Sequence, residues 1–326
     1  MSPQMADPSE PSDAPRKPPR LRPGDTVGIV APANPWEKRS ELQRAVAGLA
    51  GWGLNVRLGD HVNDRHGYMA GRDEDRAADL NAMWRDPEIR AIVCLQGGYG
   101  SPRLIPLLDR EAIASNPKAI CGFSDITALH LAVAAWGNVI SFYSNGAMGV
   151  GATDVTEFSK EAFRRALFSD EPYGRIGPNP DDPWVTTIRG GKATGRLIGG
   201  CFGLVEGTIG TPIEIQTRGR ILFLETTDDH ETYLVDNGLV HLRNAGKLDG
   251  VVGVVLGDAP GKHSGVTQEL SIEDVYEELL MPLGVPVIAG LPIGHGKHHA
   301  TVPIGAIATL DADAGTLVVE EVVTAD

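Results

Sequence analysis

Short apolar runs alternate with amphipathic segments along the first half of the chain. Residues 37–50 carry apolar side chains at helical spacing and are followed at once by glycines, which predicts a helix with a glycine stop. Further helices are expected after Asp73, which can cap one, over 102–108, and over about 126–136. The runs expected to be strands are 25–31, 55–58, 90–95 and 118–123. Strands that alternate with helices predict a parallel sheet covered on both faces.

A stretch rich in proline, glycine and aspartate interrupts this rhythm at 171–193, and we expect it to be a linker. After it, the pattern predicts three strands, two helices and a final hairpin around Asp313-Ala314-Gly315. The strands are 221–225, 251–257 and 286–293, the helices lie near 233–242 and 272–280, and the hairpin segments are 306–310 and 316–320. We therefore expect an N-terminal α/β domain over 21–170 and a C-terminal domain over 194–326.

The first 20 residues differ from the rest of the chain. They contain six prolines and several charges but no apolar block, which predicts a disordered tail. A secretory signal needs a hydrophobic segment, and none is present. No stretch approaches the ~20 apolar residues of a membrane span. We therefore expect a cytoplasmic protein that has no membrane partner.

Composition narrows the classes further. The chain has 326 residues, which suits two compact domains at roughly 100–200 residues each. Lys and Arg number 29 against 43 Asp and Glu, and a net charge of −14 argues against nucleic acid or anionic lipid as the main partner. The three cysteines, Cys94, Cys121 and Cys201, lie far apart without a C-x-x-C pair. This spacing excludes a disulfide scaffold and a cysteine zinc knuckle.

The sharpest local feature is Cys121-Gly122-Phe123-Ser124-Asp125, where an apolar strand runs through a tight turn into a helix. A serine on such a turn exposes its hydroxyl, and the helix N-terminus offers backbone N–H groups, including that of Asp125, that can hold an oxyanion. Ser124 is therefore a candidate nucleophile. The alternative is that it only caps the helix. The hydrolase signature G-x-S-x-G is absent, because Ile126 stands in place of the second glycine.

A second glycine-rich turn, Gln96-Gly97-Gly98-Tyr99-Gly100, also follows a strand. Glycines there let the backbone approach a ligand or adopt positive φ. The turn matches neither the G-x-G-x-x-G dinucleotide fingerprint nor a P-loop. A binding loop and a simple tight turn are both open at this point.

A carboxylate and a group of histidines follow strands in the second half. Glu225 ends an apolar strand and is placed to orient a histidine, although Asp228, Asp229 and Asp258 compete for that role. His295, His298 and His299 cluster after the strand 286–293. They are either metal ligands or the source of one catalytic imidazole. The loop also contains Lys297, whose positive charge would oppose a bound metal cation. We expect His295 to be the base and His298 and His299 to be surface residues.

These choices define a possible serine triad. Serine is a weak nucleophile that needs a base, and the imidazole needs a carboxylate to fix its tautomer. Ser124, Glu225 and His295 each follow an apolar strand, as such a triad requires. They are spread over both expected domains, so the site is predicted at the domain interface.

At these residues the sequence resembles the serine LD-carboxypeptidase family, the muramoyltetrapeptide carboxypeptidases. The matching stretches run in order from about Leu21 to Asp311 and include LQGGYGSPRLI, NPKAICGFSDITALHLA, GRLIGG, ILFLE, LDGVVGVVLGD and LPIGHGKHHATVPIGA. The resemblance implies a Rossmann-like parallel-sheet N-terminal domain and a smaller, β-rich α/β C-terminal domain. It also implies release of a terminal D-amino acid, D-Ala, from murein tetrapeptide in cell-wall recycling. The resemblance further implies that the protein uses no metal or organic cofactor and that it forms a homodimer.

The resemblance assigns residues one by one. Ser124 in GFSD is the nucleophile, Glu225 in FLE the acid and His295 in GH the base. The backbone N–H groups of Gly98 and Asp125 are the expected oxyanion donors. The residues expected at the substrate are Gly97, Tyr99 and Trp184.

Some positions depart from the family pattern. Gln96 stands where members often have Arg, Cys201 where they have Asn, Thr226 where an acidic residue is common, and Asp236-Asn237 where Asp-Arg is usual. None belongs to the triad, so these departures bear on which substrate is cleaved. A related branch cleaves microcin-type peptidyl nucleotides and stacks an aromatic residue on the nucleotide's base. Trp184 could provide that aromatic residue here. Two other hypotheses stay open: a non-catalytic peptide-binding protein and an ordinary α/β-hydrolase esterase.

Overall fold

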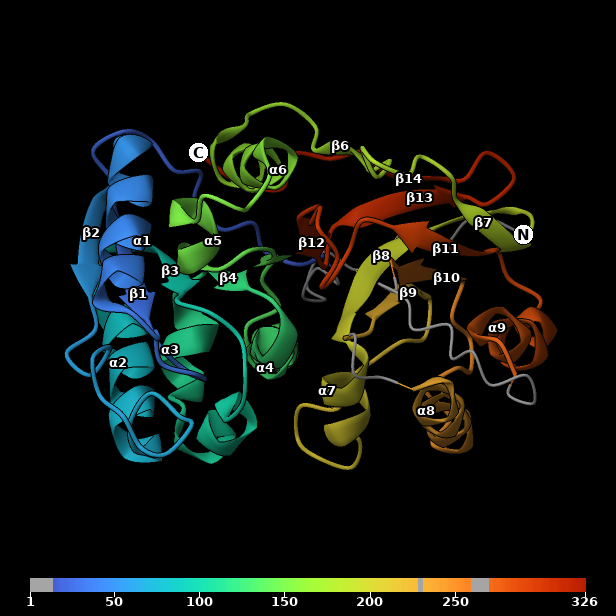
Figure 1. The fold of residues 1–326 in the computed structure, drawn as a ribbon, viewed down its shortest axis with the longest axis horizontal. Coiled ribbons are helices and arrows are strands. Elements are labelled where there is room, and N and C mark those ends of the chain that lie inside the picture. Colours follow the sequence, from blue (N-terminus) through green and yellow to red (C-terminus); the bar gives the residue numbers. More distant parts are fainter. Residues whose placement is uncertain (1–13, 228–230, 259–269) are drawn as a thin grey trace, which may run out of the picture.

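The computed structural model describes residues 14–227, 231–258 and 270–326. Two sheets stand beside each other, each flanked by helices (Figure 1). The first has six strands in the order β12-β5-β4-β3-β1-β2, and the second has eight in the order β6-β14-β13-β8-β9-β10-β11-β7. The predicted architecture, a parallel N-terminal sheet and a β-rich C-terminal α/β part, is confirmed.

The first sheet is built from the alternating pattern of the N-terminal half. Strands β1 to β5 pair in parallel, and β12 joins β5 in antiparallel fashion. Its strands are β1 (Thr26–Val30), β2 (Asn55–Leu58), β3 (Ile89–Cys94), β4 (Ala119–Gly122), β5 (Ser141–Tyr143) and β12 (Val302–Ile304). Its helices are α1 (Arg39–Gly51), α2 (Asp73–Arg85), η1 (Ser101–Leu107), α3 (Arg110–Ser115), η2 (Ser124–Ile126), α4 (Thr127–Trp136), α5 (Ala147–Gly151) and α6 (Glu157–Phe168).

The second sheet has a parallel centre and antiparallel edges. Strands β8, β9, β10 and β11 are parallel neighbours, and β7, β13, β14 and β6 pair antiparallel around them. Its strands are β6 (Gly174–Ile176), β7 (Thr186–Arg189), β8 (Lys192–Cys201), β9 (Arg220–Glu225), β10 (Gly253–Gly257), β11 (Val287–Leu291), β13 (Ile307–Asp311) and β14 (Thr316–Val319). Its helices are α7 (Phe202–Gly207), α8 (Thr232–Asn244), α9 (Ile272–Leu280) and η3 (Met281–Leu283).

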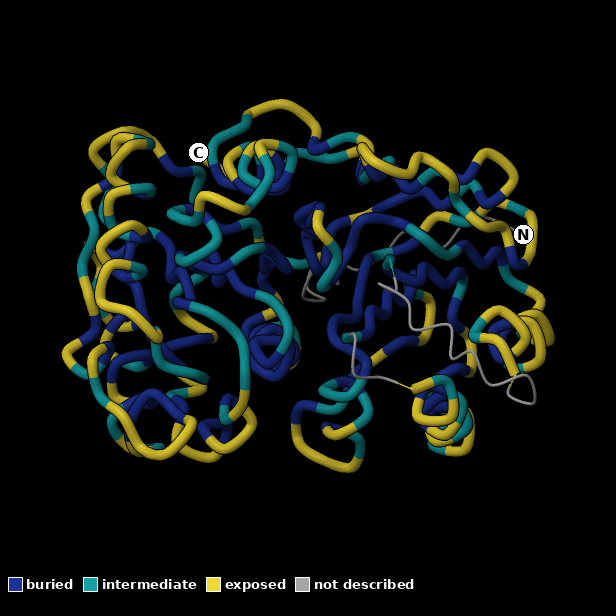
Figure 2. The backbone as a smooth tube through the Cα atoms, in the orientation of Figure 1, coloured by how far each residue is buried: buried dark blue, intermediate teal, exposed yellow. Residues whose placement is uncertain are grey.

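The core runs through both sheets. Central strands such as β3, β4, β9 and β10 are buried almost throughout, while the helices keep exposed outer faces (Figure 2). Strands that lie between helix layers lose both faces to packing, which is why they read as continuous apolar runs in the sequence. The predicted final hairpin is present, with Leu310 paired to Leu317.

Three segments are placed differently from their sequence-based expectation. The stretch 171–193, expected to be a linker, supplies β6 and β7, the two edge strands of the second sheet. Residues 14–20 of the expected disordered tail are packed, with bridges from Arg16 to Val139 and from Pro19 to Ala325, whereas 1–13 lie outside the described residues. The third is β12, which leaves the C-terminal half to pair with β5. In each case pairing with a distant strand supplies order that local composition does not indicate.

Among the described residues, no helix has the length and apolarity to cross a bilayer.

Candidate active site

The turn that carries Ser124 is held in a strained conformation. Ser124 has φ 58°, a left-handed backbone conformation that non-glycine residues rarely adopt and that often marks functional sites. Behind it, His130 accepts a hydrogen bond from Ser141 at Nδ1 and donates from Nε2 to the Gly122 carbonyl, both at 2.9 Å. This assignment holds because a carbonyl can only accept. Burial lowers the His130 pKa to about 4, so the ring is neutral and serves as a structural brace.

Glu225 and His295 are hydrogen-bonded across the end of the second sheet. Glu225 ends β9 and is 1% exposed, and its Oε2 lies 2.7 Å from His295 Nδ1. Gly294, with φ +111°, gives the carboxylate its space, because a Cβ there would approach Glu225 Oε2 to 2.3 Å. A carboxylate bonded to Nδ1 fixes the tautomer that leaves Nε2 as the base atom.

Ser124 and His295 line the same cavity, which has a volume of about 1000 Å³. The His295 ring lies 5.1 Å, centroid to centroid, from Phe123, the residue before the serine. Gly97 faces the nucleophile directly, since a Cβ at this position would come within 2.9 Å of Ser124 Cβ. A cavity of this size accommodates a small peptide. Ser124 and His295 thus share one cavity, and Glu225 is buried behind the imidazole.

The other predicted residues divide into those at the cavity and those away from it. Gly97, Gly98 and Tyr99 line it, and Gly98 has φ +117°, which only glycine adopts readily. Asp125 follows the serine; its buried carboxylate accepts the Ser101 N–H at 2.7 Å, and burial raises the pKa of the carboxyl. Trp184 does not line the cavity: its side chain is 83% exposed on the surface.

Two expectations about the histidine group need correction. His298 and His299 were expected at the surface, but they are 7% and 3% exposed. His298 bonds Thr156 through Nδ1 at 3.1 Å. The His299 ring packs edge-on against Phe123 with centroids 4.9 Å apart, and burial lowers its pKa to about 3, so it is a neutral wall beside the site. The apolar partners for these imidazoles come from α6 and the Ser124 turn, which local sequence does not reveal.

The competing carboxylates do not take the place of Glu225. Asp258 accepts a hydrogen bond from Asn179 Nδ2 at 3.1 Å, and burial raises the pKa of its carboxyl. Asp228 and Asp229 lie outside the described residues. Among the residues that the structure describes, Glu225 is thus the carboxylate bonded to His295 Nδ1.

Two residues that the sequence did not single out tie the site together. The Ser124 N–H donates to Tyr143 Oη at 2.9 Å, and Tyr143 Oη–H donates to Glu225 Oε1. Thr127 Oγ1 donates to the Ser124 carbonyl at 2.7 Å and accepts the Cys201 N–H at 3.0 Å. Both join the two sheets. No strand was predicted at β5, which carries Tyr143, so the sequence offered no local signal for this residue.

The sequence matches two family descriptions that together cover most of the chain. They are the LD-carboxypeptidase N-terminal domain over residues 27–144 and the LD-carboxypeptidase C-terminal domain over 194–310. The chain belongs to the LD-carboxypeptidase family. This confirms the resemblance drawn from the motifs. The protein is a hydrolase of the carboxypeptidase type.

Individual relatives agree with this membership. A Bacillus subtilis protein described as a probable murein peptide carboxypeptidase is 37% identical over 93% of this chain and 94% of its own. A solved muramoyltetrapeptide carboxypeptidase from Oxalobacter formigenes superposes with TM-score 0.78 at 27% identity, covering 90% of this chain and 97% of its own. An MccF-like protein from Bacillus anthracis superposes with TM-score 0.81 at 26% identity, covering 92% and 98%.

Two of the positions that depart from the family pattern line the cavity, whereas Asp236 and Asn237 lie on α8 and do not. Gln96 and Cys201 both line it, and Gln96 Nε2 donates to the Pro35 carbonyl at 2.6 Å. Thr226 directly follows Glu225 and is buried. Gln96 and Cys201 help to shape the walls of the cavity without taking part in the Glu225–His295 bond.

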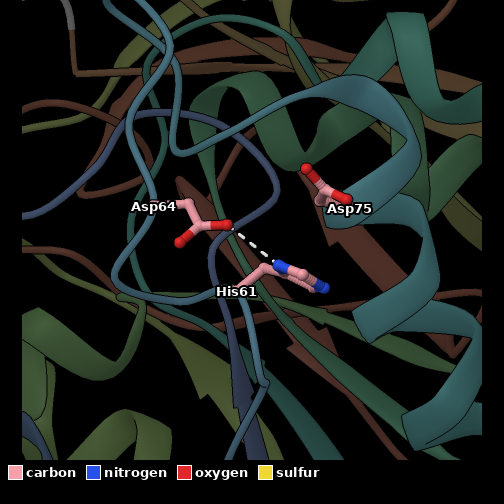
Figure 3. A group of neighbouring side chains, drawn as sticks. All are labelled: His61, Asp64 and Asp75. Atoms are coloured by element: carbon pink, nitrogen blue, oxygen red, sulfur yellow. Dashed lines mark hydrogen bonds and ion pairs between the residues drawn. The ribbon is translucent and has the colours of Figure 1, made fainter.

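A possible cation site lies elsewhere. Within the described ranges, the group of three side chains with ligand atoms within 4.8 Å of one another is His61, Asp64 and Asp75 (Figure 3). His61 Nδ1 is 2.9 Å from Asp64 Oδ2, and this hydrogen bond raises the pKa of His61. None of the three lines the cavity.

We therefore expect hydrolysis to be insensitive to chelation. His295 is engaged by Glu225, while His298 and His299 are buried in separate contacts, so the three imidazoles do not converge as zinc ligands do. Incubation with excess EDTA, followed by an assay of carboxypeptidase activity, is expected to leave the rate unchanged. Loss of activity with recovery on adding zinc would contradict this prediction.

Proposed function

We propose that this protein is a serine carboxypeptidase that cleaves an L-to-D peptide bond and releases terminal D-Ala from murein tetrapeptide. The observation that carries the proposal is the buried Glu225 bonded to His295 at a cavity that Ser124 also lines. The murein substrate is supported by the names of the relatives from Bacillus subtilis and Oxalobacter formigenes.

The proposed reaction is acyl transfer in two steps. His295 Nε2 takes the Ser124 proton, and Oγ attacks the carbonyl that precedes the terminal D-residue. His295 then gives the proton to the leaving amine, whose bond to the carbonyl carbon breaks, and an acyl-enzyme remains. Water, deprotonated by His295, hydrolyses the ester and restores Ser124. Glu225 stabilises the imidazolium in both steps.

Backbone amides are proposed to stabilise the oxyanion. The Gly98 and Asp125 N–H groups belong to the two turns that flank Ser124, and donors of this kind contribute about 3 kcal/mol each. Gly98 is suited to this role because its positive φ turns the peptide plane in a way that other residues resist. Gly97 and Tyr99 are proposed to contact the peptide from the same loop.

The direct test is incubation of the purified protein with murein tetrapeptide and mass spectrometry of the products. Loss of the C-terminal D-Ala, with no loss from the all-L peptide, is the expected result. A peptide that stays intact while still binding would instead indicate a non-catalytic peptide-binding protein. Cleavage of p-nitrophenyl esters without cleavage of the tetrapeptide would indicate an ordinary esterase.

A second candidate activity is hydrolysis of microcin-type peptidyl nucleotides. The likeness to the MccF-like protein of Bacillus anthracis favours it. Trp184, the aromatic residue expected to stack on the nucleotide, lies between β6 and β7 and does not line the cavity, so it lends this activity no support. Cleavage of an aminoacyl sulfamoyl adenosine at a higher kcat/KM than that of the tetrapeptide would select this activity.

Arg44 is the proposed anchor for the terminal carboxylate. Among the described residues that line the cavity, it alone carries a permanent positive charge. The nearby Glu41 carboxylate accepts the Lys38 and Glu37 N–H groups at the start of α1 through Oε2. These hydrogen bonds, with the charges of Lys38 and Arg44, lower the pKa of Glu41. A guanidinium matches a carboxylate in shape and charge.

Arg44→Gln is expected to raise KM for the tetrapeptide acid about tenfold, equivalent to about 1.4 kcal/mol of binding. The C-terminal amide, already a poor substrate without the anchored charge, is expected to change little. Arg39→Gln, on the same helix but away from the cavity, is the matched control. An equal change in KM for the acid and the amide would show that Arg44 does not bind this carboxylate.

The family resemblance also implies a cytoplasmic homodimer, and we propose both for this protein. A light-scattering mass of twice 34.6 kDa is the expected result in solution. A mass of one chain at micromolar concentration would contradict the dimer.

A further inference from the structure

A single phenol joins the nucleophile turn to the acid of the proposed triad. Tyr143 ends β5 in the first sheet, and Glu225 ends β9 in the second. Tyr143 Oη accepts the Ser124 N–H at 2.9 Å and donates its own proton to Glu225 Oε1. Glu225 uses its other oxygen for His295 Nδ1. Both carboxylate oxygens are therefore held, one from each side of the interface.

The direction of these bonds follows from what each group can do. A backbone amide only donates and a carboxylate only accepts, so the phenolic proton has to lie toward Glu225. Burial and the neighbouring Glu225 charge hold the Tyr143 pKa well above its usual value, so this proton stays in place. The side chain is fully buried, which keeps water from replacing it.

The rings around the phenol add no competing charge. His130 and His299 lie 5.9 and 5.8 Å from the Tyr143 ring, and burial keeps both neutral, with pKa values lowered to about 4 and about 3. Phe123 and Phe223 close two further sides. The Cys201 thiol, also near, has its pKa raised by burial and stays protonated. Glu225 is thus the charge that the phenol faces within this shell.

We infer that Tyr143 is a positioning residue for the hydrolytic reaction, holding the Glu225 carboxylate in register with His295 while it fixes the strained backbone of Ser124. This inference rests on the proposed function. Because Tyr143 engages the Ser124 N–H, that amide is not a donor to the oxyanion. The oxyanion hole therefore has to be made by other amides, as proposed for Gly98 and Asp125.

Tyr143→Phe tests the inference, with Tyr173→Phe as the matched control. Tyr173 is equally buried and donates to the Thr301 carbonyl at 2.7 Å, so both variants lose one buried hydroxyl. We expect both to lower Tm, but only Tyr143→Phe to lower kcat for D-Ala release, by about 10- to 100-fold with KM changed less than threefold. Equal kcat for the two variants would overturn the inference.

A double-mutant cycle separates positioning from general destabilisation. In the Glu225→Gln background, Tyr143→Phe is expected to lower kcat less than twofold further, because the contact through which it acts is already altered. Full additivity of the two effects would contradict the proposed role. The rate of Ser124 labelling by a fluorophosphonate gives the same comparison without a peptide.

A spectroscopic measurement on the free protein keeps the test independent of the substrate. The proton on His295 Nδ1, shared with Glu225, is expected to give a low-field ¹H resonance, assigned by its loss in Glu225→Gln. Tyr143→Phe should move this resonance and Tyr173→Phe should not. Incorporating 3-fluorotyrosine at 143, which keeps shape and fold but makes the phenol a stronger donor, should also move it. A resonance unmoved by both changes at 143 overturns the inference, whereas absent D-Ala release by the wild type would refute only the proposed function.

Discussion

Ser124→Ala is expected to lower kcat for D-Ala release by roughly 10⁴ or more, because the variant has no hydroxyl to form the acyl-enzyme. KM should change little, since the cavity around the serine is otherwise intact. Steady-state kinetics with murein tetrapeptide measure both quantities. Residual turnover would come only from the oxyanion donors and binding, which act without the nucleophile.

Ser144→Ala is the matched control for this change. Ser144 is also a buried serine at a strand end, but its hydroxyl donates to the Phe142 carbonyl at 3.2 Å and does not line the cavity. It should keep kcat within a few fold of the wild type. D-Ala release by Ser124→Ala at a near-normal rate would remove Ser124 from the proposed mechanism.

Glu225→Gln is expected to lower kcat by roughly 10³ to 10⁴. The amide keeps the shape of the carboxylate, but it lacks the charge that stabilises the imidazolium and allows the wrong imidazole tautomer. The buried site intensifies this effect, because few other groups or waters can compensate for the lost charge. The measurement is kcat at fixed pH with saturating tetrapeptide.

Asp258→Asn is the comparison for the loss of a neighbouring carboxylate. Asp258 follows β10 as Glu225 ends β9, yet its hydrogen bond is to Asn179. We expect it to keep kcat within a few fold. Equal losses in Glu225→Gln and Asp258→Asn would mean that general negative charge, and not the bond to His295, supports the reaction.

Much of the fold was predictable because its signals are local. The strands β1, β3, β4, β9 and β10 are buried on both faces. A strand of this kind is a continuous run of apolar residues, so the sequence of the run predicts its burial. Helix α6 went unpredicted although its buried residues recur at helical spacing. Strand β8 was hidden by its three glycines, which weaken any strand pattern but allow close approach, as at Gly200 against Thr127.

The candidate site was predictable to a different degree. Strand-end positions singled out Ser124 after β4 of the first sheet, and Glu225 and His295 at the ends of β9 and β11 of the second, because the carboxyl ends of parallel strands are where α/β sheets place their sites. That the two sheets bring these ends to one cavity could not be predicted from the sequence. The burial of His298 and His299 was not predictable, because the atoms that cover them come from segments more than 100 residues away. The position of Trp184 outside the cavity was not predictable either, because it depends on the pairing of the following strand, β7, with β11 at the sheet edge.

Amino-acid order alone was enough for the α/β class, the turn that presents a serine, and membership of a carboxypeptidase family, because each depends on neighbours in the chain. Folding in three dimensions decided which strands close the sheet edges, where β12 pairs, and how Tyr143 comes to lie between Ser124 and Glu225, 82 positions away from it along the chain. The physical reason is that hydrogen bonds between distant segments form only when packing brings their donors and acceptors together. Periodicity in a sequence predicts local elements, but it does not show which distant elements will be in contact.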